Sequence, residues 1–163
     1  MEKMNKVENS DIVRRTIFSL VNVASNKTSN DYAWSSIKKL LNELKSNYSF
    51  LEYVKIGELD ELNNTKEDII IMSKMNFIEP KDLGRAIQDL VDLYKKYLGK
   101  KAGYFFISEF KDVLGDEYHT IIKNIGVDLR IIDLQNEMHG IEYKKYKIKD
   151  DSSSNIAYLE KDE

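Results

Sequence analysis

Apolar side chains recur at three- and four-residue intervals along much of this chain. Residues with that spacing lie on one face of an α-helix, so the pattern predicts five amphipathic helices. In the second expected helix the apolar stripe runs from Trp34 to Leu44, and Ser29 or Asn30 begins the helix. The expected helices span about 10–24, 30–44, 80–98, 101–114 and 116–125.

Residues that favour helix ends support these limits. Ser10 is expected to cap the first helix, and Pro80 suits the first position of the third. Gly99 is expected to end the third helix in a left-handed conformation, and Gly115 and Gly126 to end the two that follow.

Three shorter segments have the composition of strands. Residues 50–56 and 69–72 are rich in aromatic and β-branched side chains, and residues 141–148 alternate in polarity. Residues 57–68 form an acidic connection that is either a loop or a short helix, and residues 127–138 fit either a helix or a strand. Because helices and strands do not alternate, we expect an α+β fold, predominantly helical, with about five helices and a small sheet of two to four strands.

The third and fourth expected helices are apolar over more than one face. Tyr94, Tyr97, Tyr104, Phe106 and other aromatic residues lie close together in the sequence. A helix that is apolar over a wide arc is covered on more than one side. We therefore expect the third helix to be central, and this surface to be covered by the rest of the domain, by a partner or by a small ligand.

Composition indicates one intracellular globular domain. The 163 residues are 42% hydrophobic and 33% charged, with one proline and no cysteine, which removes disulfides and thiolate metal sites. We expect a single globular domain over 1–149, followed by an acidic, Ser-rich mobile tail over 150–163. The polar beginning of the chain and the absence of a long apolar run favour a cytoplasmic protein without membrane contact.

The charge distribution argues against nucleic acid as a partner. The net charge is −3, and residues 149–163, with two basic and five acidic side chains, account for all of it. Residues 1–148 hold 23 basic and 23 acidic side chains and are neutral overall. A nucleic-acid binder needs a positive field to displace counterions, and this chain has no net excess to supply one.

No motif identifies a metal site, a cofactor site or a catalytic group. His119 and His139 lack the partner spacing of a zinc site, and the acidic segment 58–68 fails the pattern of a calcium-binding loop. The segment Gly99–Gly103 is not a phosphate-binding loop, although an anion at the start of the fourth helix stays open. We expect no cofactor and no metal, and an enzyme that uses a pair of carboxylates is the least favoured possibility.

The sequence favours a non-catalytic regulatory or protein-interaction module that self-associates through its helices as a homodimer or binds another protein. Tyr97 and Tyr104 are the expected interface residues, because tyrosine is enriched in interface cores. The alternative is a small-molecule-binding sensor domain with an aromatic-lined pocket. Its expected lining is Tyr104, Phe106, Phe110 and Tyr118.

Overall fold

The computed structural model describes residues 7–133. The chain divides into two compact units, Met1–Asp128 and Leu129–Glu163, and of the second only residues 129–133 are described, as the start of a helix. This settles part of the ambiguous segment 127–138 in favour of a helix. The expected strand 141–148, His139 and the expected tail 150–163 lie outside the described residues. No helix within residues 7–133 combines the length and the apolar character needed to cross a membrane.

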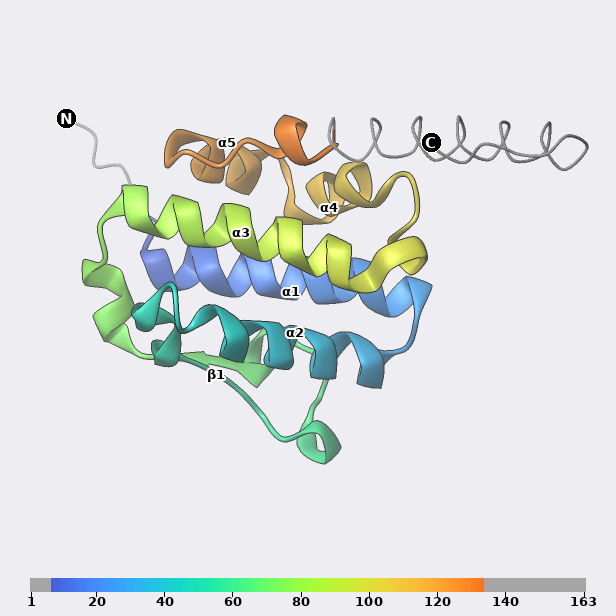
Figure 1. Ribbon diagram of the computed structural model, residues 1–163. Coiled ribbons are helices and arrows are strands. Elements are labelled where there is room, and N and C mark those ends of the chain that lie inside the picture. The colour runs from blue at the N-terminus through green and yellow to red at the C-terminus, as the bar shows by residue number, and fades with distance from the viewer. Residues whose placement is uncertain (1–6, 134–163) are drawn as a thin grey trace, which may run out of the picture. The chain divides into compact units, whose positions relative to one another are not determined.

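The first unit is a helical bundle with one small sheet, so the expected α+β, predominantly helical fold is confirmed. Three long helices lie side by side, and two short helices pack nearby (Figure 1). The helices are α1 (Asn9–Lys27), α2 (Asn30–Leu44), α3 (Pro80–Leu98), α4 (Phe106–Leu114) and α5 (Asp116–Asn124).

The sheet has two short antiparallel strands, β1 (Val54–Ile56) and β2 (Ile69–Ile71), with Lys55 opposite Ile70. The strand expected at 69–72 is confirmed, but the one expected at 50–56 is wrong in its first half. Residues Ser49–Tyr53 form a 3-10 turn, η1, which places Leu51 in the core while its neighbours stay at the surface. Further 3-10 turns are η2 (Leu59–Glu61), η3 (Lys66–Asp68), η4 (Ser73–Phe77) and η5 (Gly99–Ala102).

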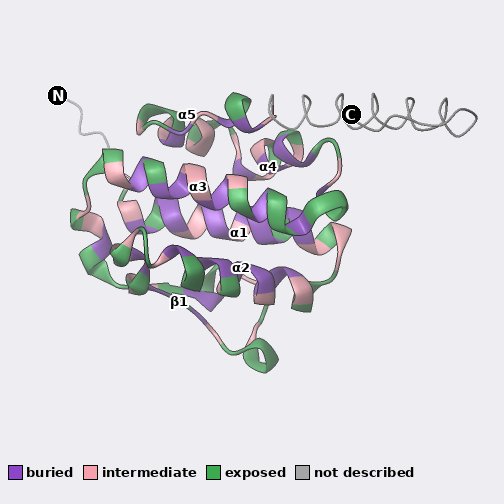
Figure 2. Cartoon of the chain, in the orientation of Figure 1, coloured by how far each residue is buried: buried purple, intermediate pink, exposed green. Residues whose placement is uncertain are grey.

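Helix α1 occupies the centre that the sequence assigned to the third helix. It contacts α2, α3, α4, α5 and β2, whereas Leu93 and Tyr97 of α3 are exposed. Figure 2 shows buried residues along α1. They include Ser10, Thr16 and Ser19, which are polar but small, and small side chains let neighbouring helices approach closely. Because serine and threonine are not counted as apolar, the sequence pattern predicts fewer buried residues in α1 than the structure shows.

Two helices begin or end as expected, whereas the start of α1 differs from expectation. Ser29 caps α2 by accepting a hydrogen bond from the backbone N–H of Tyr32, Pro80 begins α3, and Gly99 follows it at φ +59°. Helix α1, however, begins at Asn9, so Ser10 is not its cap. The backbone N–H of Ser10 instead donates to Asn76 Oδ1 at 2.8 Å, which joins the start of α1 to η4.

The fourth helix begins later than expected, at Phe106 rather than Lys101. Residues Gly99–Ala102 form η5, and Gly103 then adopts φ +81°, a conformation that redirects the chain before α4 begins. Tyr104 and Phe105 lie in this turn and are exposed, whereas Phe106 is fully buried. Two of the aromatic residues that were expected to widen an apolar helix therefore lie outside it.

Helix α3 and the end of α5 meet at backbone distance. A Cβ atom at Gly84 would lie 1.9 Å from the carbonyl oxygen of Ile125, so only glycine fits there. One turn further along α3, Gln88 binds the backbone of Asp128 twice, accepting from its N–H at 2.7 Å and donating to its carbonyl at 3.1 Å. These contacts fix the chain that follows α5 against α3.

Candidate functional site

An open groove of about 450 Å³ runs between α2 and β1. Its floor is apolar and its rim is polar. Helix α2 contributes Ser35, Lys38, Lys39, Leu41 and Asn42, and Lys45 follows directly after the helix; the strand side contributes Val54, Lys55, Ile56, Glu58 and Leu59.

The spacing of residues in α2 explains how the helix serves both the core and the groove. Ser35, Lys38, Asn42 and Lys45 follow one another at intervals of three, four and three, so they form one stripe. The parallel stripe that includes Ile37 and Leu44 is buried against the rest of the unit. The polar stripe therefore stands at the boundary between the core and solvent, facing the groove.

The groove carries an excess of positive charge. Four of its lining residues are lysines and one, Glu58, is acidic. Lys38 Nζ lies 3.9 Å from Glu58 Oε2, but both side chains are well exposed, so this pair contributes little to stability. Lys39 lies 5.8 Å from the centre of the Tyr97 ring. Three positive charges in excess on one open groove attract anionic groups.

One edge of β1 faces away from β2. Met72 donates its backbone N–H to Tyr53 at 2.9 Å, and Gly57 donates to Asp68 at 3.1 Å, which fixes the hydrogen-bonded pairs of the ladder as 53/72, 55/70 and 57/68. Val54 and Ile56 alternate with these pairs, so their backbone groups point to the opposite edge. Both residues line the groove.

The loop that borders the groove is held by internal hydrogen bonds. The buried carboxylate of Asp68 accepts from the backbone N–H groups of Asn63 and Thr65, at 3.0 and 2.9 Å. Asn64, at φ +61°, accepts from the indole N–H of Trp34 at 3.0 Å. Asp68 thus organises the acidic connection 57–68 from within, and the bond between Asn64 and Trp34 ties this connection to α2. Glu58 and Leu59 lie at its start.

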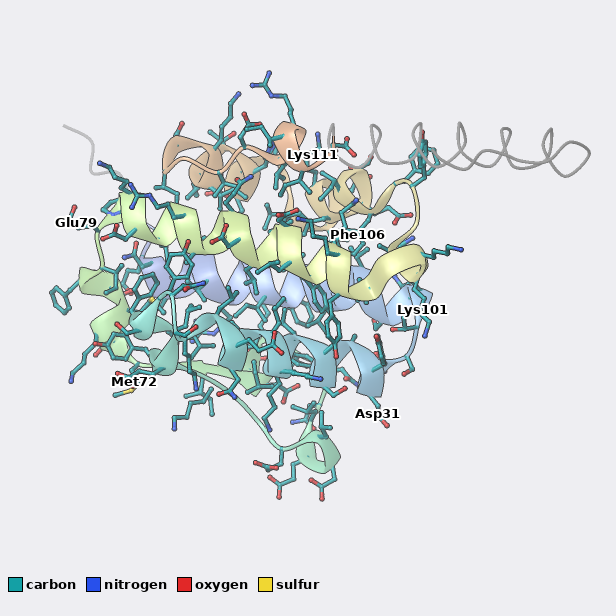
Figure 3. The ribbon with its side chains drawn as sticks, viewed as in Figure 1. Asp31, Met72, Glu79, Lys101, Phe106 and Lys111 are labelled. Atoms are coloured by element: carbon teal, nitrogen blue, oxygen red, sulfur yellow. The ribbon has the colours of Figure 1, made fainter. Side chains whose placement is uncertain are left out.

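The four aromatic residues of the expected pocket differ widely in their exposure. Phe106, labelled at the start of α4 in Figure 3, and Phe110 are fully buried, whereas Tyr104 is 57% exposed. Tyr118 is half-buried, with the Arg15 guanidinium 5.0 Å from its ring centre. Phe106 and Phe110 therefore belong to the core, and the aromatic-lined pocket stays a prediction.

The two expected interface residues are both accessible. Tyr97 is 39% exposed, and Tyr104 contacts the still more exposed Phe105 edge-on, with ring centres 5.7 Å apart. Lys101 of η5 lies 5.0 Å from the ring centre of Tyr32, and Figure 3 shows it at the same end of the bundle as Asp31. This end of the unit thus presents aromatic and basic side chains to solvent.

The described histidine and two tyrosines with raised pKa values lie outside the groove. His119 is half-buried on α5, and no cluster of three or more metal-ligating side chains occurs within residues 7–133. Burial, together with a hydrogen bond to Asp89, raises the pKa of Tyr48 to about 12. Burial also raises the pKa of Tyr94, whose hydroxyl donates to the carbonyl of Ala33 at 2.8 Å. Neither tyrosine lines the groove.

Comparison of the chain with protein-family models, with curated proteins and with solved structures finds no match. The groove was not predicted from the sequence, because the candidate residues were aromatic. The available signal was the polar stripe beside the apolar stripe of α2, with Lys38 and Lys45 two turns apart. What the sequence could not show is that Lys55 of β1 lies across from that stripe.

Proposed function

We propose that this chain is a non-catalytic protein-interaction module that binds an acidic segment of a partner protein in the groove between α2 and β1. The observation that carries the proposal is the combination of an apolar floor with a rim of four lysines and one glutamate. Apolar contacts supply affinity, and the uncompensated positive charge selects acidic partners and speeds their approach.

The arrangement of the lysines favours a chain-like ligand over a compact anion. Along α2 the groove extends from Ser35 to Lys45, which corresponds to about 15 Å at the rise of an α-helix. Lys38 and Lys45 occupy successive parts of that length, and Lys55 lies on the facing strand. A phosphate or carboxylate on its own would need donors that converge on one point, whereas spaced lysines match carboxylates spaced along a peptide.

A random peptide library selected on the full chain tests this proposal. We expect the selected peptides to contain more Asp and Glu than Lys and Arg, together with apolar residues. The double variant Lys38→Glu, Lys55→Glu should weaken their binding by about tenfold or more, since each lost charge pair at an interface is worth about 1 kcal/mol or more.

The matched control is Lys74→Glu, Lys123→Glu, which makes the same change of charge at exposed lysines that do not line the groove. At about 0.15 M salt, charges more than about 8 Å from the peptide are largely screened, so this variant should bind normally. Peptides without an acidic excess, or equal weakening by both double variants, would reject the groove as the binding site.

Self-association is a second candidate function, supported by the exposure of Tyr97 and Tyr104 beside Phe105. Exposed aromatic residues are enriched at interface cores, and two-fold dimers are the commonest oligomers. Light scattering at micromolar concentration should then give a dimer that dissociates in Tyr97→Glu or Tyr104→Glu. A monomer mass of 19.0 kDa at every concentration would exclude it.

A further inference from the structure

We infer that the acidic partner segment binds as an added β-strand on the free edge of β1, with apolar and acidic residues in alternation. This inference deepens the proposed function and rests on it. It specifies the conformation of the ligand and the backbone groups that bind it.

The free edge offers three backbone groups for strand addition. Ile56 contributes its N–H and its carbonyl, and Val54 contributes its carbonyl, because its own N–H donates to Leu51 within η1. Within residues 7–133 no other group hydrogen-bonds to these three. A residue placed opposite Ile56 can exchange two hydrogen bonds with it, as in any antiparallel ladder, and a neighbouring N–H can donate to Val54.

The groove supplies the space in which such a strand would lie. Neighbouring strands are separated by about 4.8 Å, and the open volume borders the outer edge of β1, with α2 as its other wall. A strand added there would lie along the lysine stripe of α2. The site therefore combines an unpaired strand edge with a charged wall.

The alternation of side chains along β1 predicts the pattern of the ligand. Val54 and Ile56 are buried on one face of the sheet, and Lys55 is exposed on the other. In a paired strand, residues opposite one another lie on the same face. Residues opposite Val54 and Ile56 should then be apolar and cover the floor near Leu41, whereas the residue between them should be acidic and pair with Lys55.

The same lysines explain why the edge would select another sequence rather than a second copy of β1. Two copies paired edge to edge would bring Lys55 and the lysines of α2 close to their counterparts, and like charges across strands are destabilising. An acidic strand removes that repulsion. The charge thus acts both as an attraction for the partner and as a barrier to self-pairing.

Amide hydrogen exchange on the full chain tests the inference, with Ac-EVEVEV-NH2 as the probe and Ac-EEEVVV-NH2 and Ac-KVKVKV-NH2 as controls. We expect the alternating acidic peptide to bind most tightly and to slow exchange of the Ile56 amide by about tenfold or more, because a new hydrogen bond protects it. The Lys55 amide, already paired with Ile70, should change less and serves as the internal reference.

N-methylation of the probe supplies a second measurement that leaves the fold of the protein untouched. Methyl groups on the amides of one alternating set should abolish binding, whereas the same number on the other set should be tolerated, because alternate amides of a strand point to opposite edges. A helical or irregular bound peptide would show no such two-residue period.

The outcomes separate this inference from the proposed function. Lysine-dependent binding of peptides without protection of Ile56, or without the two-residue period, would overturn strand addition and leave the groove as the binding site. Peptide binding that did not depend on Lys38 and Lys55 would overturn both strand addition and the proposed function. Tighter binding of the probe after removal of residues 150–163, which contain five acidic side chains, would assign the groove to the chain's own acidic end and overturn the separate partner.

Discussion

Two contacts within the first unit are built in opposite ways. Where α3 meets the end of α5, the elements approach to backbone distance at Gly84, and Gln88 binds both backbone groups of Asp128. Where α2 faces β1, the elements stand apart, and lysines line the space between them. The first contact has almost no freedom to change its residues. The second leaves charges at the surface and, within residues 7–133, an edge of β1 without a hydrogen-bonded neighbouring strand.

The difference indicates which contact stabilises the fold and which is available for binding. Close packing and satisfied polar groups contribute to the free energy of folding, and unpaired charge and an open strand edge do not. Substitutions at the first contact should therefore lower stability without a direct effect on binding. Substitutions at the second contact should weaken binding and leave stability nearly unchanged.

The largest effect is expected for Gly84→Ala. The added methyl group would collide with the carbonyl of Ile125 at 1.9 Å, and backbone cannot yield as a side chain tip can. We expect a loss of about 3 kcal/mol in the free energy of unfolding, measured by urea denaturation. Gly57→Ala is the control, since its nearest contact would be 3.4 Å from a leucine methyl. Equal stability of the two variants would contradict the close contact.

A smaller loss is expected for Gln88→Ala, which removes both hydrogen bonds to Asp128. We expect a decrease of about 1–2 kcal/mol in stability, because the freed backbone groups are only partly accessible to water. Gln88→Glu keeps an acceptor for the Asp128 N–H and should recover part of the loss. If the glutamate variant were less stable than the alanine variant, the hydrogen bond at 2.7 Å would not be the important one.

Thr16→Val tests the interior between the two contacts and should raise stability. Within residues 7–133 the Thr16 hydroxyl is buried without a hydrogen-bond partner, beside a cavity of about 10 Å³ whose other lining residues are apolar. Removing an unsatisfied polar group should add about 1 kcal/mol. Thr28→Val, which removes a hydroxyl that donates to Ala24 at 2.7 Å, should lower stability instead. Destabilisation in both variants would show that the Thr16 hydroxyl has a partner.

The smallest effect on stability is expected at the groove. Lys38→Glu with Lys55→Glu should leave the free energy of unfolding within about 0.5 kcal/mol of the original, because both side chains are at the surface and the Lys38–Glu58 pair is exposed. Thermal denaturation measures this. A large loss would mean that these lysines support the fold, and the comparison of the two contacts would fail.

The sequence predicts the helices well because their apolar residues repeat with the helical period and their ends carry strong signals. Pro80 and Gly99 delimit α3 as expected. Failures occur where three-dimensional packing decides between local options. Nothing in residues 49–53 excludes a strand, but the structure buries only Leu51 of this segment, which favours a turn. Gly103 is compatible with a helix and with a turn that redirects the chain, and the structure has the turn.

The candidate site was less predictable than the fold. A binding groove depends on which surfaces the fold brings together, and the residues of α2 and β1 are separated by a turn that the sequence does not orient. Large aromatic side chains suit a ligand pocket and a core equally well, and here Phe106 and Phe110 are buried in the core. Lysines such as Lys38 look like ordinary surface residues until Lys55 is seen to face them across the groove.

The hydrogen bond between Trp34 and Asn64 gives the chain a built-in optical reporter. Trp34 is the one tryptophan in the sequence, and its side chain is buried. Its indole N–H donates to Asn64, which lies on the same loop as Glu58 and Leu59. A ligand that displaces this loop would break the bond and change the polarity around the indole. The emission of a single fluorophore would then follow occupancy of the groove without any label.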